Sequence, residues 1–163
     1  MVKVFDEELS GRIGMLIDAG PIEDAEALHW LARAAGSLIF AAQDEGHHVE
    51  LADSQNDLVR MIPPFADGRE ILDFLARLKS RTSKSGLADR LDQLSGKMSA
   101  RASICLLMTR WNPELEPLIH DWLNHKRALS VYLPKASEAP DLSGLKCFFY
   151  SASGIHSTLD RKD

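Results

Sequence analysis

Short runs of apolar residues alternate along this chain with longer segments in which apolar residues recur every three or four positions. A continuous apolar run is typical of a strand buried on both faces of a sheet, and the three-and-four spacing is typical of an amphipathic helix. The polar tail that begins at Ser151 is expected to fray. The pattern predicts strands over 2–5, 12–18, 47–52, 58–62, 102–108, 128–133 and 145–150, and helices over 22–45, 68–80, 87–98 and 113–123.

Turn and capping residues set the limits of these elements. Gly46 is expected to end the first long helix in a left-handed conformation. Asp67 is the expected N-cap of the helix that follows it, and Asn112 with Pro113 starts the last helix in the same way. The loop 53–57, rich in Asp and Asn, suits a hairpin, so the two short strands that it joins are predicted to be antiparallel.

The alternation of strands and helices predicts one α/β domain over residues 1–163. We expect a doubly wound, mostly parallel sheet of about six strands, with one antiparallel hairpin strand and helices on both faces. Strand 12–18 is expected to be central, so that Asp18 stands at its carboxyl end, where open α/β sheets bind ligands. The strand at 2–5 has nothing before it, so the chain is also interpreted as a possible piece of a longer protein.

The net charge, the length of the apolar runs and the positions of the cysteines limit the classes of partner and the cellular location that we expect. The net charge is -5 without a clustered basic stripe, which argues against nucleic acid. No apolar run approaches the roughly 20 residues that span a bilayer, so no direct membrane insertion by this segment is expected. Cys105 and Cys147 both lie in apolar runs, which predicts buried, reduced thiols and a cytoplasmic location.

Several short motifs carry a resemblance to a known family. A strand that ends in Asp18, a long helix, a hairpin and a strand that closes on Met108-Thr109-Arg110 resemble the von Willebrand factor A domain. Segments 3–6, 15–18 and 46–51 are more closely similar to a bacterial family catalogued as domain of unknown function fifty-eight, whose carboxyl-terminal half is A-domain-like. The resemblance implies the strand order 3-2-1-4-5-6. It also implies an amino-terminal membrane anchor in many relatives and a partnership with AAA+ ATPases of the MoxR kind.

The same resemblance implies a divalent-cation site that this sequence has partly lost. The family's motif of Asp, any residue, Ser, any residue, Ser falls on Asp18 to Ile22, so Asp18 is kept while Gly20 and Ile22 replace both hydroxyls. The family's second Asp falls on Arg110. A hard cation needs several oxygen ligands and is repelled by a nearby guanidinium. We therefore expect no metal and no cofactor, with Asp18 facing Arg110 and the guanidinium standing where the ion would sit.

No other motif predicts catalysis. The histidines lack metal-ligand spacing, and no nucleophile elbow, phosphate-binding loop or dinucleotide fingerprint occurs. If Asp18 were an aspartyl nucleophile, it would need a second Asp nearby as the acid/base, and the sequence has none at that spacing. An enzyme is therefore not expected. Trp111, which follows a strand at the same edge, would suit partner binding if exposed, although packing beneath its loop is the interpretation that we favour.

These observations predict a non-catalytic protein-interaction or scaffolding module with a degenerate metal-ion-dependent adhesion site and a protein partner. An enclosed apolar pocket converging on Asp18 would instead favour the alternative, a small-ligand-binding or hydrolytic domain that uses the same edge. A purely structural fragment of a longer chain is a further alternative. The predicted partner-binding rim comprises the segments 18–22, 63–68 and 109–112, with Asp18, Gly20, Asp67, Thr109, Arg110 and Trp111 as its main residues.

Overall fold

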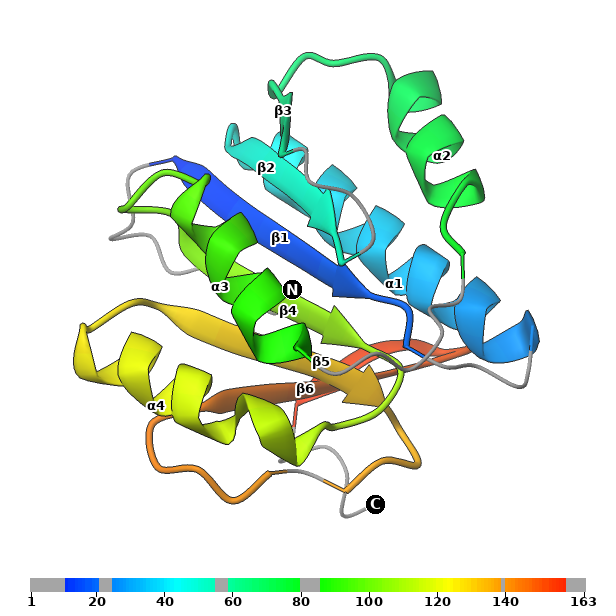
Figure 1. The fold of residues 1–163 in the computed structure, drawn as a ribbon. Helices are drawn as coiled ribbons and strands as arrows, with labels where there is room; N and C mark the ends of the chain where they lie inside the picture. The colour runs from blue at the N-terminus through cyan, green and yellow to red at the C-terminus, as the bar shows by residue number, and fades with distance from the viewer. Residues whose placement is uncertain (1–10, 21–24, 55–58, 80–85, 139, 158–163) are drawn as a thin grey trace.

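A seven-stranded sheet with helices on both faces forms the structure, a computed structural model that describes residues 11–20, 25–54, 59–79, 86–138 and 140–157 (Figure 1). The strand order is β3-β2-β1-β4-β5-β6-β7. The strands are β1 (Arg12–Asp18), β2 (His48–Asp53), β3 (Arg60–Ile62), β4 (Ser103–Met108), β5 (Leu129–Pro134), β6 (Lys146–Ser151) and β7 (Gly154–Ser157). The helices are α1 (Ala25–Asp44), α2 (Gly68–Ala76), α3 (Leu87–Gly96) and α4 (Glu116–Asn124), with a 3-10 turn η1 (Pro113–Leu115) before α4.

Five central strands are parallel, and the two edge strands run the other way. β1 pairs in parallel with β2 and β4, and the parallel pairing continues through β5 to β6. β3 is antiparallel to β2, as predicted for the hairpin, and β7 is antiparallel to β6. The α/β class and the mostly parallel sheet are therefore confirmed. The predicted strand at 2–5 lies outside the described residues.

The tail does not simply fray after Ser151, so that prediction was wrong for residues 154–157. Gly154 has φ +122°, a conformation that glycine adopts without strain, and it allows the chain to reverse into β7. A strand of four mostly polar residues at a sheet edge has no apolar run that pattern reasoning could detect.

Side chains of the central strands alternate between two cores. On β1, Met15 and Ile17 pack with apolar residues of α1 and α2, whereas Leu16 packs with those of α3 and α4. Figure 1 shows the pair α3 and α4 on one face of the sheet and α1 on the other. Both faces are covered, which explains the unbroken apolar runs. Trp122 and Cys105 are buried, as expected.

Gly14 in β1 lies close to Met98, in the segment after α3. A Cβ at this position would lie 2.6 Å from the Met98 sulfur and 2.8 Å from Cδ1 of Ile104. No larger residue fits without displacing those side chains, so glycine here permits the layer of α3 to approach the sheet.

Helix ends follow the capping residues closely. At Gly46, with φ +82°, the N–H donates to the Gln43 carbonyl, and the N–H of His47 donates to that of Ala42, which closes α1 as predicted. The last predicted helix is divided instead. Asn112 caps η1 by accepting from the N–H of Glu114 at 3.0 Å, and α4 starts afterwards with Pro117 in its first turn, where no N–H is required.

Candidate functional site

The carboxyl ends of β1 and β4 meet at the point where the chain switches sides in the sheet. β2 and β3 lie on one side of β1, and β5, β6 and β7 lie beyond β4. Asp18, the last residue of β1, is in register with Met108, the last residue of β4. In open α/β sheets ligands bind outside the strand ends at such a switch point. The structure therefore brings Asp18 and Thr109 to the edge that sequence reasoning selected.

Asp18 is a buried carboxylate and does not form part of the exposed surface. Its exposed fraction is 4%, and Oδ1 accepts a hydrogen bond of 2.7 Å from the hydroxyl of Ser54. The N–H of Ser54 donates to the Ile17 carbonyl at 2.8 Å, which ties the end of β2 to the end of β1. The Arg90 guanidinium, from α3, donates in turn to the carbonyl of Ser54. A buried charge needs such hydrogen bonds to offset its lost hydration.

Gly20 and Thr109 complete this polar cluster. Gly20 is buried, and a Cβ on it would lie 3.4 Å from the Thr109 hydroxyl and 3.6 Å from Oδ2 of Asp18. The Ser54 hydroxyl therefore bonds Asp18 directly, and the Thr109 hydroxyl lies beside Gly20, as Oδ2 of Asp18 does. Sequence reasoning missed Ser54 because the residue was assigned to a hairpin loop. The signal that could have found it is its place directly after β2, next to the end of β1 in a parallel sheet.

Arg110 does not occupy the place expected for it. It is exposed, and among the residues that the structure describes no ion pair joins it to Asp18, so the predicted pair was wrong. The physical reason is the register, because Met108 faces Asp18 across the sheet and Thr109 follows it directly. Arg110 comes one residue later, where the chain has left the sheet. Trp111 is half-buried and packs against the core beneath α3 and α4, as favoured from the sequence.

Asp67 lies at the opposite edge of the sheet. It is the N-cap of α2, as predicted, and accepts from the N–H of Arg69 at 3.0 Å. The Pro63 carbonyl accepts from the Gln43 side chain at 3.2 Å, near the end of α1 that leads into the start of β2. Because β3 is antiparallel to β2, its last residue lies beside the amino half of β2. The segment 63–68 is therefore not part of the rim around Asp18, and its inclusion there was wrong.

The described residues around Asp18 do not by themselves make a complete divalent-cation site. The described donors are one carboxylate and two hydroxyls, and one carboxylate oxygen already accepts from Ser54. Mg²⁺ requires six oxygen ligands in near-octahedral geometry. In the described ranges no group of three or more His, Cys, Asp or Glu side chains gathers in a way that could hold a metal.

A second buried carboxylate, Glu50 in β2, was not noticed in the sequence. It is 4% exposed, and its two oxygens accept from the hydroxyl and the N–H of Ser99 at 2.7 and 2.9 Å. Arg12 lies 3.6 Å from Oε1. Burial lowers the pKa of Arg127, and the negative charge of Glu50 opposes that shift. This cluster anchors the segment after α3 to the sheet.

The two cysteines are free, and neither suits nucleophilic chemistry. Burial raises the pKa of Cys105 to about 12, despite a contact with Tyr132 that lowers it. Burial also raises the pKa of Cys147, which is half-buried rather than fully buried as expected. Both thiols therefore stay protonated near neutral pH, whereas the reactive species is the thiolate.

In the part of the chain that the structure covers, no helix is both long and apolar enough to cross a membrane. The order β3-β2-β1-β4-β5-β6 is the one that the A-domain resemblance implies, but dinucleotide-binding folds share it, so order alone does not show the family. Comparisons of the chain with models of known protein families, with curated proteins and with solved structures gave no match.

Proposed function

We propose that this domain is a non-catalytic protein-interaction or scaffolding module of the von Willebrand A type, whose partner contacts the carboxyl edge of the sheet at residues 109–111. The observation that carries the proposal is the contrast between Asp18 and Arg110. Asp18 is 4% exposed and hydrogen-bonded by Ser54, whereas Arg110 is exposed one strand away. A side chain that acts on a ligand must be reachable, and an exposed guanidinium is a frequent anchor in protein interfaces.

A small-ligand-binding or hydrolytic domain at the same edge is the second candidate. The Ser54 hydroxyl donates to Asp18 at the switch point and the Thr109 hydroxyl lies beside Gly20 next to them, and this group of polar side chains favours the second candidate. The two candidates differ in what Asp18 does. In a module Asp18 braces two strand ends, whereas in a ligand-binding domain its carboxylate must become accessible to the ligand.

Site-specific photo-crosslinking tests the interaction proposal. A photoreactive amino acid is placed at Arg110 or at Trp111, and a matched control is placed at Arg69, which is exposed near the opposite edge. The variants are expressed in the native host, and the adducts are identified by mass spectrometry. A MoxR-type ATPase, which the resemblance implies, is the first partner to look for.

The proposal requires the same protein partner to be crosslinked from positions 110 and 111 and not from position 69. The charge reversal Arg110→Glu should then weaken capture of that partner at least tenfold, which corresponds to about 1.4 kcal/mol. Equal crosslinking from position 69, or full capture by the Arg110→Glu variant, would place the interface elsewhere.

A further inference from the structure

Three large apolar side chains are exposed where α2 lies against α1. Phe65 is 87% exposed, Leu72 57% and Phe40 38%. We call these three residues the α1–α2 surface. Figure 1 shows α2 at the periphery of the molecule, near the edge of the sheet that ends with β3. A single exposed apolar side chain is ordinary, whereas a continuous group of them marks an interaction site.

The start of α2 joins two of these side chains. A Cβ on Gly68, the first residue of α2, would lie 3.5 Å from Cε1 of Phe40, so the Phe40 ring from α1 lies over the first turn of α2. Leu72 follows Gly68 by four residues and therefore lies on the same face of the helix, one turn further along.

The turn that carries Phe65 is held on the same part of α1. The Pro63 carbonyl accepts hydrogen bonds from the Gln43 side chain at 3.2 Å and from the N–H of Ala66 at 3.0 Å. Ala66 also packs against the core beneath α1. The two ends of this turn therefore contact α1 within one helical turn, at Gln43 and at Phe40. Phe65 is held next to Phe40, and the α1–α2 surface is continuous.

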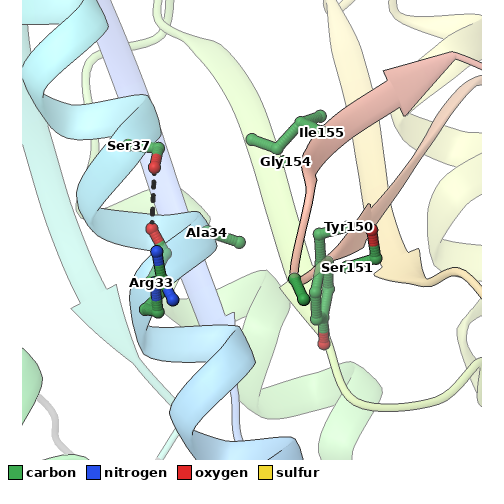
Figure 2. A pocket seen from close by; sticks show the side chains of 8 residues that line it. Arg33, Ala34, Ser37, Tyr150, Ser151, Gly154 and Ile155 are labelled. Atoms are coloured by element: carbon green, nitrogen blue, oxygen red, sulfur yellow. Dashed lines mark hydrogen bonds between the residues drawn. The ribbon is translucent and has the colours of Figure 1, made fainter.

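The opposite flank of α1 is occupied by the β6–β7 hairpin. Figure 2 shows Ala34 and Ser37 of α1 on one side of a hollow and Tyr150 and Ile155 of the hairpin on the other. The hollow measures about 50 Å³, which is room for a few water molecules. The exposed ring of Phe40 is on the other flank, toward α2, so the apolar part of the exposed surface of α1 continues onto α2.

The size of the α1–α2 surface fits a reversible pair of identical chains. A large apolar side chain presents on the order of 150–200 Å², so the three exposed fractions amount to about 300 Å². Two copies would cover about 600 Å² of apolar surface, and homodimer interfaces are roughly 65% apolar. The whole interface would then bury about 1,000 Å², the lower limit for a specific interface. Such a pair dissociates in the micromolar range.

The charges beside the α1–α2 surface also suit a second copy. Arg69, Glu70 and Asp73 are exposed on α2, and Arg77, which follows the helix, pairs with Asp73 at 3.2 Å. In a two-fold pair every contact occurs twice, so a surface with both signs can meet itself without net repulsion. A partner of one strong charge would be repelled by part of the same rim.

We propose that the α1–α2 surface binds a second copy of this chain in a two-fold symmetric dimer. Phe40, Phe65 and Leu72 of one copy pack against the same residues of the other, and the charges of α2 form the rim. The surface contains none of the residues 109–111, so the dimer would present that edge of the sheet twice. A photoreactive group at Arg69 would then capture a second copy of the chain, which is a different adduct from that of positions 110 and 111, so the two proposals fail independently.

Sedimentation equilibrium between about 2 and 500 µM protein tests the dimer. The proteins compared are the wild type, Phe65→Ser, Leu72→Gln and the double variant. Met61→Gln is the matched control, because Met61 is 45% exposed on β3 while its neighbour Ile62 packs into the core beneath α1, so Met61 points to the opposite face of the sheet. Circular dichroism verifies that each variant is folded, and amide spectra at two protein concentrations report which residues self-association perturbs.

We expect the weight-average mass of the wild type to rise toward twice that of the monomer, with a dissociation constant of about 1–100 µM. Each single variant should raise that constant at least tenfold, the double variant should stay monomeric, and Met61→Gln should behave as the wild type. The amides of residues 64–73 should shift with concentration. A wild type that is monomeric throughout would overturn the inference and leave the surface to a different protein. It is equally overturned by variants that dimerise like the wild type, or by a dimer that leaves those amides unchanged.

Discussion

The hydrogen bond between Ser54 and Asp18 distinguishes a structural brace from a ligand-binding carboxylate. Ser54→Ala removes the hydroxyl that donates to Oδ1 at 2.7 Å and adds no atoms. The two side chains are 2% and 4% exposed, so water does not readily replace the lost donor. A hydrogen bond to a charged group contributes about 1.5–3 kcal/mol. We therefore expect the free energy of unfolding to fall by about 2 kcal/mol.

The sign of the change in the free energy of unfolding on replacing the Asp18 carboxylate distinguishes the two roles. If Asp18 braces the strand ends, Asp18→Asn weakens the bond from Ser54 and lowers the free energy of unfolding by about 1 kcal/mol, because bonds to neutral acceptors are roughly half as strong. If Asp18 is instead retained to bind a ligand, its buried charge costs stability, and Asp18→Asn should be more stable than the wild type.

Equilibrium unfolding in urea, followed by tryptophan fluorescence, measures both changes. The slope with urea concentration should stay constant while the midpoint moves. Ser143→Ala, at an exposed serine, is the control and should leave the midpoint unchanged. The double variant Asp18→Asn/Ser54→Ala should lose less stability than the sum of the single changes, by about 1 kcal/mol. A loss below about 0.5 kcal/mol for Ser54→Ala would refute the brace, since ordinary surface changes have effects of that size.

Four other predictions follow from the packing and the chemistry. Gly14→Ala should lower the free energy of unfolding in urea by about 1–3 kcal/mol, because the new Cβ would lie 2.6 Å from the Met98 sulfur. Glu50→Gln should cost about 2 kcal/mol in the same assay, because a buried carboxylate that accepts two hydrogen bonds becomes neutral. An aromatic disulfide reagent at pH 8 should label Cys147 in the native protein and Cys105 only after unfolding, since burial raises the pKa of Cys105 to about 12; peptide mass mapping shows which thiol reacts. Titration calorimetry with Mg²⁺ should detect no site with a sub-millimolar dissociation constant. Such a site would contradict the expectation that the divalent-cation site has been lost.

The architecture was predictable because burial on two faces leaves a strong record in the sequence. The strands at 12–18 and 103–108 contain the apolar runs 13–17 and 104–108, and the side chains of these runs pack into one or the other of the two cores. Their boundaries shifted by no more than a residue from the expected ones. β7 left no such record, because an edge strand of four residues needs no apolar face.

The candidate site was predictable only as far as strand ends determine position. Parallel pairing puts the residues after β1, β2 and β4 together, so Asp18 and Thr109 could be placed and Ser54 should have been. Asp67 was assigned to the wrong end of the sheet. The antiparallel hairpin had been predicted, and it should have placed the segment after β3 beside the amino half of β2. Which way a side chain turns after a strand, as at Arg110, depends on packing that no periodicity encodes.

The charges at the carboxyl edge of the sheet bear on the kind of partner that it would attract. The chain carries a net charge of -5, yet the carboxylates that end β1 and β2 at this edge, Asp18 and Asp53, are buried, and Asp18 accepts a hydrogen bond from Ser54. Arg110, which follows β4 at this edge, is exposed and carries a positive charge. An acidic protein that exposes a guanidinium at one edge attracts anionic groups of a partner locally while repelling them elsewhere. If that distribution guides binding, raising the salt concentration should slow association of the partner at this edge, and substituting Arg110 should reduce the salt dependence as well as the affinity.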